Sequence, residues 1–440
     1  MVEGRLALRR RGDSVTARVA FFTDSFHEVN GVALTSREFV RFAHRRSIPL
    51  LSIHAGPRDA MYQEGSVTTL EFKRGLVQWK LEHDLAIDLM FPRFRKRILE
   101  ALREFKPDLI HITGPGDAGI LGAWAAWELK APLAASWHTN LHEFASRRMT
   151  RALRPFPAAL SSRLASWAED KILDRCAWFY GLAKVLFAPN PELVDLLALR
   201  TRRPAFLMVR GIDTELFSPA RRIRTGKTFV IGYVGRVSPE KNVRMLASVE
   251  QALLAAGLVD YRILVVGQGS ERDWLAQNLR SAEFPGVLRG EALANAYASM
   301  DVLVFPSHTD TFGNVVLESM ASGVPAVVSS RGGPKFLIEH GVTGWIAEDA
   351  ADFAAAVAEM YRNPEKRSWM GEQARRIAER YSWDAVFEEV YARYGAAFPI
   401  TGYHSGCDAN KTIGRHTTAR LRAVGAVHRQ SADAPLRPSL

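Results

Sequence analysis

Short apolar runs alternate with longer amphipathic stretches along most of this 440-residue chain. The short runs, bounded by polar turn residues, predict buried strands, and the longer stretches between them predict helices. This alternation predicts an α/β fold of parallel sheets with helices on both faces. The strands are expected at 19–23, 109–112, 132–136, 186–188, 205–209, 229–235, 261–266, 302–305 and 324–328.

The apolar pattern divides into two halves. The segment 210–227 is rich in Arg, Pro, Thr and Gly and has no clear apolar face, so it predicts an interdomain linker. Terminal helices are expected over 351–398, with breaks near Asn363-Pro364 and Tyr381-Ser-Trp383. The expected parts, in chain order, are an extension without regular structure over 1–16, a first domain over 17–210, the linker proper over 211–227, a second domain over 228–380, a helix over 381–398 and a basic tail without regular structure over 399–440.

The composition is that of a globular protein with sizeable cores, since 47% of the residues are hydrophobic and 24% are charged. Two cysteines, Cys176 and Cys407, form no disulfide framework and favour a reducing cytoplasm. We expect no membrane-spanning helix and no secretory signal, because no long apolar run occurs and none follows Arg9, Arg10 and Arg11. The net charge of +11 favours anionic partners, although no nucleic-acid-binding module is recognisable.

The segment from Asp310 to Glu318, Asp-Thr-Phe-Gly-Asn-Val-Val-Leu-Glu, is the most informative part of the chain. Apolar residues follow Gly313 at helical spacing, so we expect a helix to begin there. The unpaired N–H groups at a helix start can bind an anion such as a diphosphate. Glu318, about two turns further on, could accept hydrogen bonds from a ribose diol. The alternative is a buried helix whose flanking acids are merely solvated.

Cations and polar groups also follow other predicted strands. Arg236 and Lys241 lie after the strand that ends at Gly235, where they could neutralise a leaving diphosphate, or simply lie on an exposed loop. Gly31 follows the first strand and permits close backbone approach to a phosphate, or forms an ordinary turn. His138 directly follows another strand, where it could contact a sugar or phosphate, or play a structural role.

Several motifs are missing from the chain. It has no Asp-x-Asp pair, no CxxC and no HExxH, which argues against a bound metal. We therefore expect the positive charge for a leaving group to come from Arg236, Lys241 and helix N-termini, with no cofactor. Residues 145–167 form a basic amphipathic stretch, which predicts either contact with an anionic membrane surface, a helix packed on the domain or a site for an anionic acceptor.

Taken together, these motifs resemble those of the retaining glycosyltransferases of family 4, over about 17–398. The resemblance implies the GT-B fold: two Rossmann-like domains facing each other across a cleft, with a C-terminal helix crossing back to the first domain. The N-terminal domain would bind the acceptor and the C-terminal domain the donor nucleotide. The segments that carry it are Thr23-Asp24, Asn30-Gly31, His138-Thr139, Gly235 to Lys241, Phe305 to Pro325, Gly332-Gly333, Gly341 to Gly344 and Tyr381 to Trp383.

The resemblance also implies roles for particular residues. Arg236 and Lys241 would hold the donor diphosphate, Glu318 would bind the ribose, and Asp310 a sugar hydroxyl. His138 would contact the transferred sugar near the reacting carbon. The groups that would approach the diphosphate or the sugar through their backbone are Gly31, Phe312, Gly313 and Asn314.

One residue departs from the family pattern, because the first acid of the motif is usually Glu and here is Asp310. The leading hypothesis is a metal-independent hexosyltransferase, cytoplasmic or peripheral on the inner face of the membrane. It would move mannose or glucose from a GDP- or UDP-linked donor to a lipid or saccharide hydroxyl. The alternatives are a non-catalytic sugar-nucleotide-binding protein and, less consistent with the Phe-Gly motif, a sugar-nucleotide epimerase.

Overall fold

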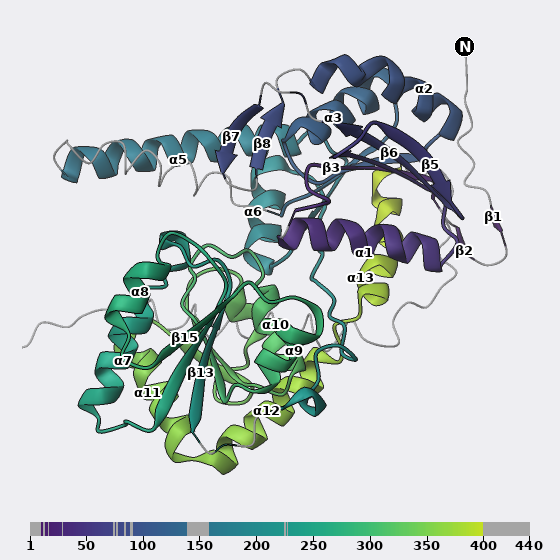
Figure 1. Ribbon diagram of the computed structural model, residues 1–440. Helices are drawn as coiled ribbons and strands as arrows, with labels where there is room; N and C mark the ends of the chain where they lie inside the picture. The colour runs from purple at the N-terminus through teal and green to yellow at the C-terminus, as the bar shows by residue number, and fades with distance from the viewer. Residues whose placement is uncertain are drawn as a thin grey trace, which may run out of the picture. The chain divides into compact units, whose positions relative to one another are not determined.

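A computed structural model describes residues 10–11, 14–15, 17–28, 30–73, 75, 78–82, 85–88, 91–138, 158–223, 226 and 228–398. The chain forms two main sheets, one in each half, and each consists mainly of parallel strands (Figure 1). The predicted tail at 399–440 lies outside the described residues, as does most of the extension at 1–16. The predicted two-sheet α/β architecture is confirmed.

The first sheet has eight strands in the order β12-β11-β10-β9-β3-β4-β6-β5, and only the edge strand β5 runs antiparallel to its neighbour. Both faces are covered by helices, so its strands are buried and rich in apolar residues. Its strands are β3 (Val19–Thr23), β4 (Leu50–Gly56), β5 (Ala60–Glu64), β6 (Val67–Lys73), β9 (Leu109–Ile112), β10 (Leu133–Ser136), β11 (Val185–Ala188) and β12 (Ala205–Leu207). The helices of this half are α1 (Gly31–Arg45), α2 (Arg95–Phe105), α3 (Asp117–Leu129), α5 (Ala158–Tyr180) and α6 (Pro191–Thr201).

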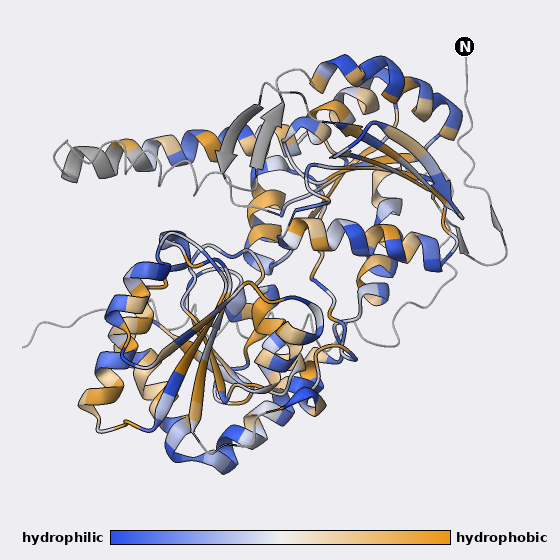
Figure 2. Cartoon of the chain, viewed as in Figure 1, coloured by the Kyte–Doolittle hydropathy of each residue, from blue (hydrophilic) through white to orange (hydrophobic). Residues whose placement is uncertain are grey.

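The second sheet has six parallel strands in the order β15-β14-β13-β16-β17-β18. Hydrophobic residues concentrate on its strands and on the helix faces that pack against them (Figure 2). The strands are β13 (Phe229–Val234), β14 (Tyr261–Val266), β15 (Ala282–Gly286), β16 (Val302–Phe305), β17 (Ala326–Ser329) and β18 (Gly344–Ala347). The helices are α7 (Met245–Ala255), α8 (Arg272–Asn278), α9 (Gly290–Ala298), α10 (Asn314–Ala321), α11 (Ala350–Arg362) and α12 (Pro364–Ala378).

Helix α13 (Trp383–Arg393) returns to the first half of the chain, where it packs beside α1 (Figure 1). Phe387 of α13 is fully buried and lies 4.9 Å from the ring of Phe39, centroid to centroid. The backbone N–H of Ile212, in the linker, donates to the carbonyl of Tyr381 at 2.8 Å. The predicted crossing of the C-terminal helix back to the first domain is thus confirmed.

The apolar pattern missed five strands of the two main sheets, namely β4, β5, β6, β15 and β18. Strand β6 reads Val-Thr-Thr-Leu-Glu-Phe-Lys, in which polar residues interrupt the apolar run. Strand β15 contains Glu283, Pro285 and Gly286, which are uncommon in strands, and it forms an edge of the second sheet. Two small antiparallel pairs complete the strands: β1 (Arg10–Arg11) with β2 (Ser14–Val15), and β7 (Gln78–Glu82) with β8 (Leu85–Asp88).

Candidate functional site

The loop after β13 carries the two predicted phosphate-binding cations. Val237 is fully buried in the hydrophobic core around the second sheet and thereby fixes the position of this loop. Lys241 ends a single 3-10 turn, Pro239–Lys241, and α7 begins only at Met245. Lys241 therefore lies before α7 and not within it: Asn242 adopts a left-handed conformation, with φ of 54°, which ends the turn directly after the lysine.

Lys241 makes a bidentate ion pair with Asp310, from a position 69 residues away in the chain. Its Nζ atom lies 2.7 and 2.8 Å from the two carboxylate oxygens. The two side chains are 19% and 23% exposed, so water screens the pair only in part. The structure thus brings together the predicted phosphate-binding lysine and the predicted sugar-binding acid.

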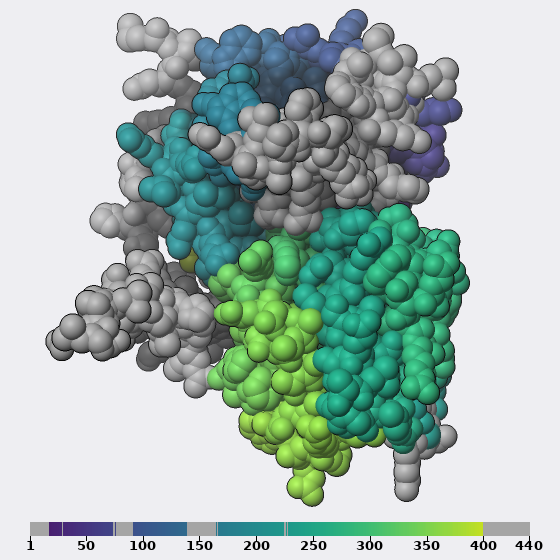
Figure 3. Space-filling view, turned by 90° about the vertical axis from the view of Figure 1, so that its left-hand side faces the viewer, coloured from purple at the N-terminus to yellow at the C-terminus, as the bar shows by residue number. Residues whose placement is uncertain are grey.

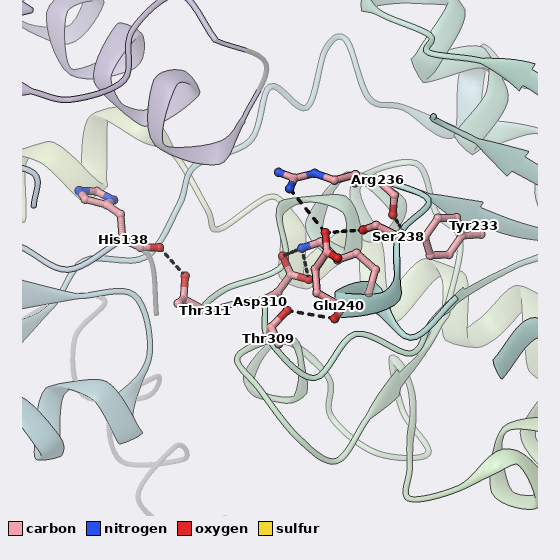
Figure 4. A network of polar contacts seen from close by, with 9 residues as sticks. His138, Tyr233, Arg236, Ser238, Glu240, Thr309, Asp310 and Thr311 are labelled. Atoms are coloured by element: carbon pink, nitrogen blue, oxygen red, sulfur yellow. Dashed lines mark hydrogen bonds and ion pairs between the residues drawn. The ribbon is translucent and has the colours of Figure 1, made fainter. Parts of the chain in front are cut away.

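Glu240 contacts the second cation, Arg236, and two neighbouring polar side chains (Figure 4). The Arg236 guanidinium lies 3.5 Å from the Glu240 carboxylate, which also accepts a hydrogen bond from the hydroxyl of Ser238. The backbone carbonyl of Glu240 accepts a hydrogen bond from the hydroxyl of Thr309 at 3.2 Å. Both cations therefore have a carboxylate neighbour, which holds each of them in place beside the loop that precedes α10.

Gly313 caps α10 with a φ of +98°, a conformation that few residues other than glycine adopt. A Cβ atom at this position would lie 2.9 Å from the ring of Pro334. The helix begins at Asn314, as predicted, and its first N–H groups have no acceptor within the helix. These groups and the helix dipole favour an anion at this end.

Glu318 is the fifth residue of α10, so it lies little more than one turn from Gly313 and not the expected two. Its carboxylate accepts a hydrogen bond of 2.7 Å from the hydroxyl of Tyr297, on α9. Burial raises the pKa of Glu318, and the Tyr297 hydrogen bond opposes that shift by stabilising the carboxylate. The free oxygen positions of an ionised Glu318 could accept hydroxyl groups.

His138 is buried directly after β10, and both of its ring nitrogens have protein partners. Arg210 donates to Nδ1 at 2.8 Å, and Nε2 lies 2.6 Å from the hydroxyl of Ser136. Because a guanidinium can only donate, Nδ1 must be the acceptor and Nε2 carries the proton. Burial and the charge of Arg210 lower the pKa of His138 well below its usual value, which keeps the ring neutral.

The hydrogen-bond chain continues beyond Ser136 into the core. The Ser136 hydroxyl lies 3.0 Å from Nε2 of His111, and Nδ1 of His111 lies 2.6 Å from the hydroxyl of Tyr394. With Ser136 accepting from His138, it donates to His111, which in turn donates to Tyr394. This relay connects the residue after β10 to the segment that follows α13.

Thr311 connects the loop before α10 to the first half of the chain. Its hydroxyl donates to the backbone carbonyl of His138 at 2.9 Å (Figure 4), and its own carbonyl accepts from Asn190 at 2.7 Å. The Arg210 guanidinium carbon lies 5.9 Å from the centre of the Phe312 ring. The backbone of His138 is thus hydrogen-bonded to Thr311, which lies between Asp310 and Phe312 in the sequence.

Gly31 also approaches the second half of the chain. A Cβ atom at Gly31 would lie 3.1 Å from the side-chain nitrogen of Asn314. Gly31 is the first residue of α1, and the Asn30 side chain caps that helix by accepting from the N–H of Ala33. The site residues predicted from both halves therefore lie around the start of α10, with His138 and Gly31 on the side of the first sheet.

Sequence reasoning missed four residues of this site: Glu240, Tyr297, Thr311 and Arg210. Arg210 is 4% exposed, and its guanidinium donates hydrogen bonds to His138 and to the carbonyls of Met208 and Val209. Arg210 is the first residue of the segment 210–227, whose composition predicted an interdomain linker. Arg210 directly follows the apolar run 205–209, which could have indicated that it is buried. Its partner His138, however, is 72 residues away in the chain.

In the described residues, no group of three or more His, Cys, Asp and Glu side chains could hold a metal ion. Over the same part of the chain, no helix combines the length and the apolar character needed to cross a bilayer. Of the basic stretch at 145–167, residues 145–157 lie outside the described residues. The rest belongs to α5.

Two family models match the chain, one in each half. Residues 29–216 match the model described as Glycosyltransferase Family 4. Residues 228–363 match the model described as Glycosyl transferases group 1. Each match covers most of one sheet with its helices.

The alignments with several similar proteins extend over most of the chain. A GDP-mannose-dependent alpha-mannosyltransferase of Corynebacterium glutamicum is 30% identical over 87% of this chain and 90% of its own length. A sulfoquinovosyl transferase of Arabidopsis thaliana is 29% identical over 86% of this chain and 74% of its own. Among solved structures, sucrose-phosphate synthase from Thermosynechococcus elongatus superposes with a TM-score of 0.64 at 18% identity, covering 86% of this chain and 99% of that one. This structural likeness confirms the GT-B fold.

Proposed function

The chain belongs to glycosyltransferase family 4, and from that premise we propose that it transfers mannose from GDP-mannose to a hydroxyl group of a lipid or saccharide acceptor. The donor is the one named for the mannosyltransferase relative. Glucose from a UDP-linked donor is the second candidate, and the donor panel below separates the two.

The observation that carries this proposal is the grouping of charges around the start of α10. Lys241 and Arg236 lie on one side, each beside a carboxylate, and the helix N-terminus at Gly313 supplies backbone N–H groups. Negative charge builds on the diphosphate as its bond to the sugar breaks, and fixed cations and dipoles stabilise it. Glu318, held by Tyr297, would accept the ribose hydroxyls.

We further propose that transfer retains the anomeric configuration and uses neither metal nor cofactor. The acceptor oxygen would attack from the face that the diphosphate leaves. The bond from the anomeric carbon to the phosphate oxygen breaks with its electron pair, and that oxygen takes the acceptor proton. Asp310 would bind a sugar hydroxyl once the donor phosphate draws Lys241 away from it. The NMR coupling of the product's anomeric proton tests retention, and activity in EDTA tests the absence of metal.

The acceptor would be reached at a membrane surface through α5. Helix α5 is labelled in Figure 1, and Figure 3 views the molecule from the side toward which this helix extends. Exposed residues follow one face of α5 at helical spacing: Leu164, Trp167, Lys171, Arg175 and Trp178. Aromatic and basic side chains on one face suit an anionic lipid surface. Replacing Trp167 and Trp178 by Ala should abolish sedimentation with phosphatidylglycerol vesicles. The same change at the exposed Trp369 of α12 should not, and equal binding of both variants would contradict the membrane role.

Donor binding and transfer assays test the central proposal. Among GDP-mannose, UDP-glucose and ADP-glucose, the true donor should raise the unfolding temperature most, because a ligand of the folded state stabilises it. Lys241→Ala and Glu318→Ala should each reduce transfer at least about tenfold, which is about 1.4 kcal/mol of transition-state stabilisation.

The matched control is Lys366→Ala, because Lys366 is also paired to an acid, Glu359 at 3.1 Å, but lies on α12. It should leave transfer unchanged. Near-normal activity in both site variants would refute the assigned site. Donor binding by the wild type without turnover on any acceptor would instead favour the non-catalytic alternative.

A further inference from the structure

A second group of polar side chains lies at the edge of the first sheet, outside the residues discussed so far. His54 on β4 and Glu71 on β6 are directly paired in the parallel register of these strands. Each is the fifth of seven strand residues, so both lie toward the carboxyl ends of their strands. In open α/β sheets, ligands bind outside this edge.

Glu71 is a buried carboxylate with few hydrogen bonds. Its side chain is 2% exposed. Among the residues that the structure describes, its only hydrogen bond comes from the backbone N–H of Arg58, at 3.3 Å. The side chains of Arg58 and His27 approach only to 3.9 Å, beyond hydrogen-bonding distance. A buried carboxylate normally accepts several hydrogen bonds, because its desolvation is otherwise costly.

His54 next to it presents a second acceptor. The ring is 1% exposed, and Nδ1 lies 3.3 Å from the carbonyl oxygen of Ala55. Because a carbonyl only accepts, Nδ1 carries the proton and Nε2 bears a lone pair. Within the described part of the chain, Nε2 is buried and has no hydrogen-bond partner. Burial lowers the pKa of His54 to about 4, so the ring is neutral near pH 7.

The loop that leads from β3 to α1 covers this pair. The ring of Phe26 stacks on that of His54, with centroids 3.9 Å apart and planes at 5°. His27 is exposed on the same loop, beside Glu71. The loop continues to Gly31, which lies against Asn314 at the start of α10. The His54–Glu71 pair and the donor site are therefore joined by one short loop.

We propose that Glu71 and His54 bind hydroxyl groups of the acceptor, and that the acceptor is a saccharide or the saccharide head group of a lipid. This inference rests on the proposed function. Both protein groups accept hydrogen bonds, so the ligand must donate them. Adjacent hydroxyls of a sugar ring can donate to both groups at once, whereas the single hydroxyl of a diacylglycerol can satisfy only one.

A comparison of two acceptor probes with the full-length chain and GDP-mannose tests the proposal. The probes are octyl β-D-glucoside, which has a sugar head, and 1,2-dioctanoylglycerol, which has one hydroxyl. Wild type should prefer the glucoside. Glu71→Gln should raise the KM for the glucoside at least about tenfold and leave the acceptor-free hydrolysis of the donor within about twofold.

A second variant and a control keep a folding defect from imitating this result. His54→Phe retains the ring stacked on Phe26 but removes the lone pair, and it should also raise the KM for the glucoside. Glu38→Gln makes the same chemical change on α1, in an ion pair with Arg41, and should leave both activities unchanged.

Three results would overturn the proposal: an unchanged KM in Glu71→Gln, a parallel loss of hydrolysis and transfer, or a wild type that hydrolyses the donor but accepts only dioctanoylglycerol. Failure of the wild type to hydrolyse or transfer any nucleotide sugar would be a different result. It would reject the proposed function itself.

Discussion

At the scale of the residue, burial and one hydrogen bond act in opposite directions on the pKa of Glu318. Burial raises the pKa of this carboxyl, and the 2.7 Å hydrogen bond from Tyr297 opposes the shift. Only the ionised carboxylate can accept two ribose hydroxyls. If Glu318 binds the ribose as proposed, the donor affinity of the site should depend on Tyr297, a residue of α9 that does not belong to the Phe-Gly motif.

Replacing Tyr297 by Phe should weaken donor binding and shift its pH dependence. Without the hydroxyl, the pKa of Glu318 rises further, so the loss of kcat/KM on acidification should begin at higher pH than in wild type. The measurement is kcat/KM for the donor between pH 5 and 8. Tyr261→Phe is the matched control, since that hydroxyl contacts Glu250 at 3.3 Å in the same domain. Superimposable pH profiles for Tyr297→Phe and wild type would contradict this role.

Asp310 forms a bidentate ion pair although it is one methylene shorter than the Glu of the family pattern. The family pattern predicts Glu here, yet the shorter Asp310 still reaches both of its contacts with Lys241, at 2.7 and 2.8 Å. The fixed position of Lys241 at the end of a 3-10 turn brings the lysine to the acid. Asp310 therefore places a carboxylate directly beside Lys241.

At the scale of the element, the start of α10 depends on a backbone conformation. Gly313 has a positive φ and packs against Pro334, and the unpaired first N–H groups of α10 follow it directly. A side chain at this position would meet both the unfavourable conformation and the proline ring. The conformation of one glycine thus holds the helix N-terminus in register with the two cations.

Gly313→Ala should reduce both stability and transfer. The positive φ alone costs about 1–2 kcal/mol for an L residue, and the contact with Pro334 adds to it. Gly290→Ala is the control, because Gly290 has a φ of +53° but open space around a Cβ. Urea unfolding should show a larger loss for Gly313→Ala, and only this variant should lose activity beyond about tenfold. Equal effects of the two changes would show that packing at Gly313 is unimportant.

At the scale of the whole molecule, the buried relay from Arg210 through His138 and His111 to Tyr394 spans the first sheet and the returning C-terminal segment. All of its members are buried, so none is screened by water. Burial lowers the pKa of His111 to about 3. Below about pH 6.5, His111 therefore binds fewer protons in the folded protein than in the unfolded chain, and its contribution to stability decreases in acid.

The stability of the protein should fall as the pH drops from 7.5 to 5.5. The contribution of neutral His111 is complete above its unfolded pKa of about 6.5 and decreases steadily below it, by about 1.4 kcal/mol at pH 5.5. Urea midpoints at the two pH values measure the change. His111→Gln should reduce this pH dependence, while His44→Gln, at an exposed position, should not. An unchanged pH dependence in His111→Gln would contradict a neutral His111.

Much of the fold follows from local patterns, because strand and helix periodicity depend on near neighbours. Strands such as β13 and β16 are continuous apolar runs, and Gly313 precedes an apolar helical pattern, so both were predicted correctly. Strand β6 was missed because Thr68, Thr69 and Glu71 interrupt its apolar character, and its pairing with β4 and β5 on either side stabilises it as a strand.

The sequence by itself specified the α/β alternation, the start of α10 and the residue types around it, since these depend on a few successive side chains. Tertiary structure alone decided that Lys241 meets Asp310, that Arg210 sets the tautomer of His138, and that His54 lies beside Glu71. Each of these contacts joins residues from separate elements. Their geometry depends on how the strands are ordered and the helices packed, and no local pattern contains that information.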